Sequence, residues 1–222
     1  MRHLGALAAL GLLLTEATCV AQETDRGRIE VSIGIRWIGA VKFGDVPARE
    51  TTPGGGTLAL FKSSTRLDRS VGGTTTLGVR LSRVLRAELA LAYNPTGISS
   101  RVMSDAEGVA DVTVSEPVTQ LLLEGGVLVQ PRRWQHGRMR PFLTAGIGYL
   151  RQLNDGRPLV QTGQSGYVGG GLYYVRATAR PGRLKATGVR ADVRALILRD
   201  GVVPEHSGRA APAVTATVFA RF

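Results

Sequence analysis

Apolar and polar residues alternate along the chain with a period of two. In residues 28–37 the odd positions are apolar and the even positions are polar or glycine, which places the two sets on opposite faces of an extended strand. The same alternation recurs in seven further segments. The sequence therefore predicts eight strands: 28–37, 70–81, 85–93, 116–130, 140–150, 165–177, 187–198 and 213–222.

The connections between these strands alternate in length. Those after the second, fourth and sixth strands are short, whereas those after the other strands are long: 39–69, 94–115, 152–164 and 199–212. An even number of strands joined in this way is typical of a barrel in an outer membrane, with short periplasmic turns and long outer loops. Lipid tolerates no open sheet edge, so the last strand must pair with the first. We expect an all-β, eight-stranded antiparallel up-and-down transmembrane β-barrel.

The positions of the aromatic residues favour a membrane barrel over a soluble fold. Trp37, Tyr93 and Tyr149 lie on the apolar face at the same end of the first, third and fifth strands, as an aromatic girdle at a membrane interface would. A soluble exported β-sandwich would show the same alternation, with its apolar face turned to a core. The soluble β-sandwich is therefore the alternative fold.

The charged residues of the strands share the opposite face. In a barrel this face lines the lumen, which eight strands make only wide enough for side chains to fill. Buried charges need partners, so we expect Glu88 and Glu124 to pair with Arg80, Arg190 or Arg194 and to plug the lumen. A small hydrated pocket, or a small pore or carrier for minor solutes, is the alternative. The predicted interior network is Glu30, Arg36, Arg80, Glu88, Glu124, Arg190, Asp192, Arg194 and Arg221.

The first residues resemble an export signal. A short basic start precedes the apolar run 4–14, and small residues stand before Gln22, which predicts a cleaved signal peptide at 1–21 and a barrel domain at 22–222. Cleavage would remove Cys19, which is the only cysteine. The exported chain would then have no disulfide and no thiolate site.

The formal net charge of +11 would ordinarily favour nucleic-acid binding. The arginines are scattered along strands and the chain is exported, so we expect no nucleic-acid partner. Several basic residues fall in the short turns, where they either contact the head groups of the inner leaflet or are simply solvated. These residues are Arg83, Arg86, Arg132, Arg133, Arg138, Arg180, Arg183 and Lys185.

The sequence offers no convincing catalytic, cofactor or metal site, and we expect no enzyme. His206 and Ser207 are adjacent, so on a strand they would point to opposite faces. The long first connection, 39–69, holds three consecutive glycines followed by "TLALF", which would extend the second strand. If this connection binds a ligand, Lys42, Phe43, Phe61 and Lys62 are the candidates; otherwise it covers the barrel mouth.

Several segments together resemble a known family. The signal peptide, "RPFLTAGIGYL", "YVGGGLYYV", "GVRADVRAL" and the terminal "VTATVFARF" are similar to the small eight-stranded outer-membrane barrels of the OmpA-like and OmpX-like group. The resemblance implies the outer membrane of a Gram-negative-type bacterium and contact with its lipids. It also implies that the assembly machinery reads the last strand at Val218, Ala220 and Phe222, although an aromatic residue is common where Ala220 stands.

Overall fold

The computed structural model describes residues 27–51, 55–103, 110–154, 160–177, 183–200 and 209–222. The predicted signal peptide, 1–21, lies outside these ranges. No helix in the described ranges is both long enough and apolar enough to cross a bilayer. The elements are β1 (Ile29–Ile38), β2 (Val41–Thr51), β3 (Thr57–Leu67), β4 (Ser70–Arg80), β5 (Leu85–Met103), β6 (Val112–Val129), the short 3₁₀ helix η1 (Arg132–Trp134), β7 (Met139–Asn154), β8 (Val160–Ala177), β9 (Ala186–Asp200) and β10 (Arg209–Arg221).

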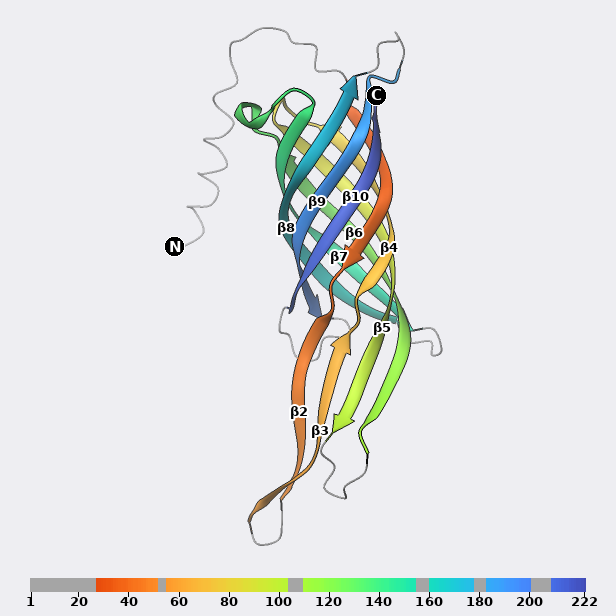
Figure 1. The fold of residues 1–222 in the computed structure, drawn as a ribbon, viewed down its shortest axis with the longest axis vertical. Helices are drawn as coiled ribbons and strands as arrows, with labels where there is room; N and C mark the ends of the chain where they lie inside the picture. The colour runs from red at the N-terminus through yellow and green to blue at the C-terminus, as the bar shows by residue number, and fades with distance from the viewer. Residues whose placement is uncertain (1–26, 52–54, 104–109, 155–159, 178–182, 201–208) are drawn as a thin grey trace.

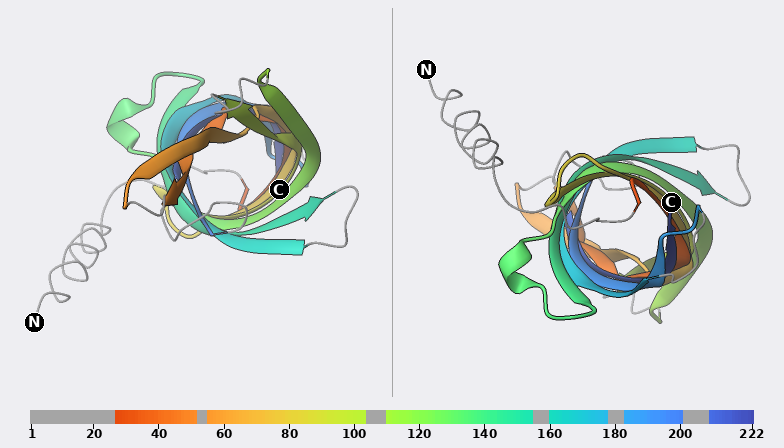
Figure 2. Two further views of the ribbon diagram at one scale, coloured as in Figure 1. Left: turned by 90° about the horizontal axis from the view of Figure 1, so that it is seen from below. Right: turned by 90° about the horizontal axis from the view of Figure 1, so that it is seen from above.

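Eight of these strands close into a barrel in the order β1, β4, β5, β6, β7, β8, β9, β10. All neighbouring pairs are antiparallel, and β10 returns to pair with β1 from Glu30 opposite Arg221 to Ile38 opposite Ala213. Seen along its axis, the barrel is a closed ring (Figure 2). The predicted fold is confirmed, and the closed ring excludes the two stacked sheets of a soluble sandwich.

The first long connection is a pair of strands and not a loop. β1 continues past Gly39 and Ala40 into β2, and β3 continues past Asp68 into β4, so that β2 and β3 extend the barrel at one end (Figure 1). β3 also pairs with the far end of β5, residues 98–103, which in turn pairs with the start of β6. We call these four segments the projecting sheet: 41–51, 57–67, 98–103 and 112–117.

Prolines mark the places where a neighbouring strand ends. Gly97 accepts a backbone hydrogen bond from Asp68 (2.8 Å), so Pro95, two residues earlier, faces the same side. There the β4–β5 pairing has ended, at Gly73 and Tyr93, and the β3–β5 pairing has not begun. Pro117 stands just beyond the last β6–β7 pair, and Pro212 just beyond the last β1–β10 pair. Because proline has no N–H to donate, these sites tolerate it inside long strands.

The two faces of the barrel wall differ as the alternation predicts. Outward side chains are apolar and exposed, with Ile33 66% and Ile147 76% accessible. The lumen is the core of the protein and is filled by side chains. The glycines that face inward make room for the largest of them: a Cβ at Gly146 would lie 2.6 Å from the ring of Tyr167, and one at Gly188 would lie 2.8 Å from Phe219.

The orientation of the barrel follows from its turns. The β4–β5, β6–β7 and β8–β9 connections and the C-terminus lie at one end, and the projecting sheet lies at the other (Figure 1). In outer-membrane barrels the short turns are periplasmic and the longer connections are extracellular. The projecting sheet is therefore at the extracellular end.

Candidate functional site in the lumen and on the projecting sheet

Glu30 lies at the periplasmic end of a polar network inside the lumen. Its carboxylate accepts hydrogen bonds from Arg86, from Arg221 Nε (2.6 Å) and from the hydroxyl of Tyr173 (2.8 Å). These four side chains come from β1, β5, β10 and β8, and all are buried. The first strand, the last strand and two others are thus joined through one carboxylate.

Arg190 continues the network towards the middle of the barrel. Its Nη1 donates to Glu88 Oε1 (2.7 Å) and to the Tyr173 hydroxyl (3.0 Å), and its Nε donates to Asp192 Oδ2 (3.0 Å). Asp192 Oδ1 accepts a further hydrogen bond from Arg194 Nε (2.6 Å). Asp192 therefore binds the two arginines of β9 that flank it and compensates their repulsion.

Glu124 completes the network on the extracellular side. Its Oε2 accepts hydrogen bonds from Arg36 Nη2 on β1 (2.6 Å) and from Arg194 Nη1 on β9 (3.4 Å). We call the connected set the lumen network; it carries four carboxylates and five guanidiniums, so its formal charge is close to neutral. The lumen network is Glu30, Arg36, Arg86, Glu88, Glu124, Tyr173, Arg190, Asp192, Arg194 and Arg221.

Apolar side chains pack among the charges at the periplasmic end of the lumen network and cover the network at its extracellular end. On the periplasmic side, the ring of Tyr173 packs between Phe142 (centroids 5.0 Å apart) and Phe219 (5.1 Å). The guanidinium of Arg190 lies over the Phe142 ring at 4.6 Å. On the extracellular side, an apolar layer crosses the barrel mouth and includes residues from nearly every strand: Ile38, Val41, Phe43, Leu67, Ala92, Leu122, Leu150, Leu196, Leu198, Ala211 and Ala213.

The lumen network includes two side chains that were not expected from the sequence, Arg86 and Tyr173. Arg80, which was expected in it, is half-buried at the periplasmic rim, whereas Arg86, which was expected in a short turn either at the head groups or in solvent, is buried and contacts Glu30. Gly78 lies between Glu30 and Glu88 in the strand register, and the Arg86 stem covers it, 2.9 Å from where a Cβ would be. Arg86 can therefore cross β4 and reach Glu30.

The sequence alone does not single out Tyr173 as an interior residue. Tyr173 and Tyr174 are adjacent, and both faces of β8 carry an aromatic residue, so the sequence gives no preference for either tyrosine as the inward one. The indication that was available is the position of Tyr173 in the alternation. It lies on the same face of β8 as Tyr167 and Val175, which are also buried.

The other predicted site residues lie on the outer surface. Trp37, Tyr93 and Tyr149 are 36%, 52% and 49% exposed and lie near the extracellular ends of the barrel walls. Val218 and Phe222 on the last strand are also exposed, and Ala220 is half-buried. Their roles as a girdle and as an assembly signal stay predictions.

The candidates in the first connection separate into two groups. Phe43 is buried in the apolar layer at the mouth, so the expectation that it contacts a ligand is wrong. Lys42, Phe61 and Lys62 are exposed on the projecting sheet. Val41 and Phe43 face the core in ordinary alternation, with Lys42 outside. The register irregularity between Lys42 and Gly44 shifts the phase after Phe43, so that Asp45, which has the same parity, is exposed.

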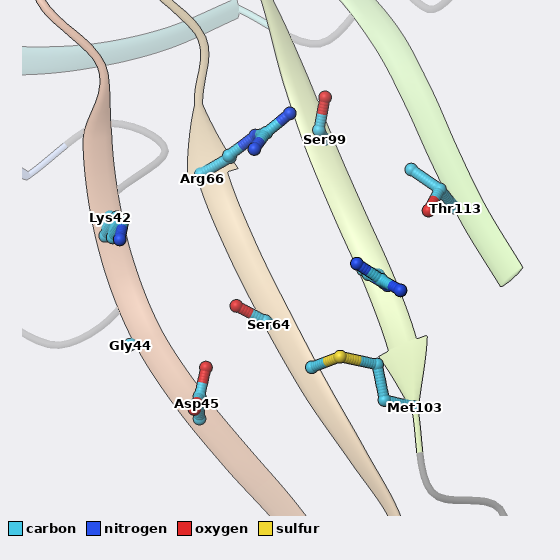
Figure 3. A pocket seen from close by; sticks show the side chains of 9 residues that line it. Lys42, Gly44, Asp45, Ser64, Arg66, Ser99, Met103 and Thr113 are labelled. Atoms are coloured by element: carbon cyan, nitrogen blue, oxygen red, sulfur yellow. The ribbon is translucent and has the colours of Figure 1, made fainter. Parts of the chain in front are cut away.

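One face of the projecting sheet carries a hollow of about 540 Å³, which we call the sheet hollow (Figure 3). Three ion pairs surround it: Lys62 with Asp45 (2.7 Å), Arg66 with Asp68 (2.9 Å) and Arg101 with Asp111 (2.8 Å). The residues that line the hollow come from four strands: Lys42, Gly44, Asp45, Ser64, Arg66, Ser99, Arg101, Met103 and Thr113.

The residues considered for catalysis offer no assembled site in the described ranges. His136 is exposed in the β6–β7 turn, with Nδ1 3.2 Å from the carbonyl oxygen of Trp134. His206 and Ser207 lie outside the described residues. In the part of the chain that is described, no three His, Cys, Asp or Glu side chains are grouped to hold a metal ion.

Solved structures share this fold. The chain aligns with the outer membrane protein OprG from Pseudomonas aeruginosa at 12% identity and a TM-score of 0.52, over 89% of this chain and 96% of OprG. It aligns with Neisserial surface protein A at 12% identity and a TM-score of 0.54, over 87% of this chain and 97% of that protein. No protein-family model and no curated protein matches the sequence. With its closed wall and apolar outer surface, the chain is a barrel of the outer-membrane type.

Proposed function

We propose that this chain is a plugged barrel of a bacterial outer membrane with a structural or surface-binding role and no catalytic step. The observation that carries the proposal is the continuous lumen network, which crosses the barrel from Glu30 to Arg36 and lies beneath the apolar layer at the barrel mouth. Outer-membrane lipids are the partner of its outer wall.

The energetics of the lumen favour a plug over a conducting path. Removing one partner of a buried ion pair costs about 3 to 5 kcal/mol, because the remaining charge is left without compensation. An ion that entered the lumen would have to displace such pairs and pass the apolar layer at the mouth. Eight strands also leave little space beyond their own side chains.

The projecting sheet supports the surface-binding part of the proposal. It extends the barrel wall at the extracellular end, is built from four strands and is tied to the barrel by the hydrogen bond from Arg209 Nη2 to the Phe43 carbonyl (3.1 Å). Binding residues are most often found on outer segments that a rigid scaffold positions.

Conductance across a planar lipid bilayer tests the plug. We expect the purified wild-type protein to give no steady conductance above that of the bare bilayer. The double variant Arg36→Ala/Glu124→Ala, which removes one pair of the network, should show brief openings. The matched variant Arg101→Ala/Asp111→Ala removes an exposed pair on the projecting sheet and should stay silent.

A large and steady conductance of the wild-type protein would favour the small-pore function over the plug. Protein that has been boiled before reconstitution serves as the control for contaminating porins, because it adds the same material without folded barrels.

A further inference from the structure

The sheet hollow lies on the face that continues the membrane-facing surface of the barrel. The β5–β6 register runs without a shift from Leu85 to Val102, so Tyr93, Ser99 and Arg101 all lie on one face of β5. Tyr93 is on the outer surface. The hollow is therefore beyond the extracellular edge of the barrel on the outward face of its wall, and not on the face that lines the barrel mouth.

Its height above the membrane follows from strand geometry. Ser99 and Arg101 are six and eight residues beyond Tyr93 on β5. With a rise of about 3.3 Å per residue and a strand tilt of about 40°, they lie some 15 to 20 Å above Tyr93. Phospholipid head groups occupy only about 5 to 8 Å on each side of the hydrocarbon core. A lipid that reaches the hollow must carry a larger head group.

The charges around the hollow indicate an anionic ligand. Lys42 stands directly opposite Arg66 across the β2–β3 pair, and like charges in this arrangement are destabilising. Arg101 pairs with Ser64 and is therefore diagonal to Arg66 on the same face. An anion between these three cations would remove the repulsion.

The carboxylates near the hollow neutralise only three of the four cations that the described residues place around it, so the net charge there favours an anion. Asp45, Asp68 and Asp111 hold Lys62, Arg66 and Arg101 in ion pairs, whereas Lys42 forms no salt bridge within the described residues. Figure 3 shows Lys42, Arg66, Ser64 and Ser99 on the same side of the four strands. The hydroxyl groups of Ser64 and Ser99 are engaged by Asp45 and Asp68, whereas that of Thr113, which also lines the hollow, can donate to a phosphate oxygen.

We propose that the sheet hollow binds the phosphorylated saccharide head group of a glycolipid in the outer leaflet, through Lys42, Arg66 and Arg101. The inference rests on the proposed function for the membrane and its orientation. The position of the hollow on the outward face, above the reach of phospholipid head groups, selects a large membrane-anchored head group over a soluble anion.

Binding of glycolipids to the full-length protein in phosphatidylcholine vesicles tests the proposal. Four probes are compared: lipopolysaccharide with a phosphorylated core oligosaccharide, the same molecule after dephosphorylation, lipid A without the core, and inorganic phosphate. We expect the first probe to bind at least tenfold more tightly than each of the other three.

Two matched variants locate the site. Lys42→Gln/Arg66→Gln/Arg101→Gln should weaken binding of the first probe at least tenfold. Arg132→Gln/Arg133→Gln/Arg183→Gln removes the same charge from exposed positions at the periplasmic end and should bind like the wild type. Heat-dependent mobility on a gel shows that both variants are folded.

Three results would overturn the inference: equal binding by the first variant and the wild type, equal binding of lipid A without the core, or equal binding of inorganic phosphate. The first would place the ligand elsewhere, the second would place it at the membrane surface, and the third would indicate a general anion site. Failure of the wild-type protein to float with the vesicles would instead overturn the proposed membrane location.

Discussion

Glu124 is a buried junction of the lumen network. It is 1% exposed, and arginines from β1 and β9 share its Oε2 atom. Glu124→Ala would leave Arg36 without its ion-pair partner. We expect the free energy of unfolding to fall by about 3 to 5 kcal/mol, measured by urea titration of the folded band in lipid vesicles.

The exposed pair between Arg101 and Asp111 gives the comparison. Its side chains are 56% and 41% accessible, so Asp111→Ala should cost only about 0 to 1 kcal/mol. If Glu124→Ala and Asp111→Ala cost the same, the lumen is wet enough to screen its charges, and the plug loses its physical basis.

At the residue scale, parity in the sequence indicates which side chains face inward but not which of them meet. Arg80 and Arg86 have the same parity and stand opposite one another. Only the space above Gly78 decides that Arg86 is the one that reaches Glu30. Such a contact depends on three strands at once, and alternation within one strand carries no information about it.

At the scale of elements, the β2–β3 hairpin has an electrostatic contact that can be measured by itself. Asp45 is exposed, and its pKa is lowered below the ordinary value of 3.8, first by the hydrogen bond from Lys62 and then by one from Ser64. The contact therefore stabilises the hairpin at neutral pH, and this stabilisation is lost as the pH falls through the lowered pKa.

An NMR titration of the Asp45 carboxyl group checks this. Lys62→Met should raise the Asp45 pKa towards its ordinary value. Lys42→Met should change it less, because Lys42 acts on Asp45 only through its charge and is the weakest of the contributions. Equal shifts in the two variants would mean that general charge, and not the hydrogen bond, sets the titration.

The sequence predicted where the barrel strands lie but not how far they extend. Residues 94–115 were expected to be a loop because of the proline and glycine in "YNPTG", whereas β5 runs on to Met103 and β6 starts at Val112. The expectation failed because a proline disrupts a strand only on the side where a partner needs its N–H. On that side of Pro95 the pairing with β4 has already ended, at Tyr93. No local sequence pattern shows where this pairing ends.

At the scale of the whole molecule, closure between β1 and β10 is the defining contact. Ile33 and Val218 stand opposite each other on the outer face, and directly paired residues have Cα atoms about 4.5 to 5.5 Å apart, within the range of a disulfide. In a Cys19→Ser background, Ile33→Cys/Val218→Cys should oxidise to an intramolecular disulfide that changes gel mobility until it is reduced.

Ile33→Cys/Val189→Cys is the control, because Val189 pairs with Val218 and lies one strand further from β1. It should stay reduced under the same conditions. Cross-linking in the control but not in the closure pair would mean that the first and last strands are not neighbours.

The whole fold was more predictable than the site. Eight alternating segments require a closed ring, because an open sheet edge in lipid would leave backbone groups unpaired. This holds whichever side-chain contacts form inside the ring. The extension of the second strand by "TLALF" was expected, and β3 is this extension. The rest of the projecting sheet was missed because residues 39–69 follow no strict alternation: irregularities after Lys42 and Ala48 shift the pattern between the two faces.

The Glu30–Arg221 pair has a consequence for biogenesis. These two residues are separated by 191 positions, so they can pair only after β10 has reached β1. Until then, Arg86 and Tyr173 are the partners left to the Glu30 carboxylate among the described residues. The charge of Arg221 therefore favours closure of the unfinished ribbon, in addition to the backbone hydrogen bonds between the two strands.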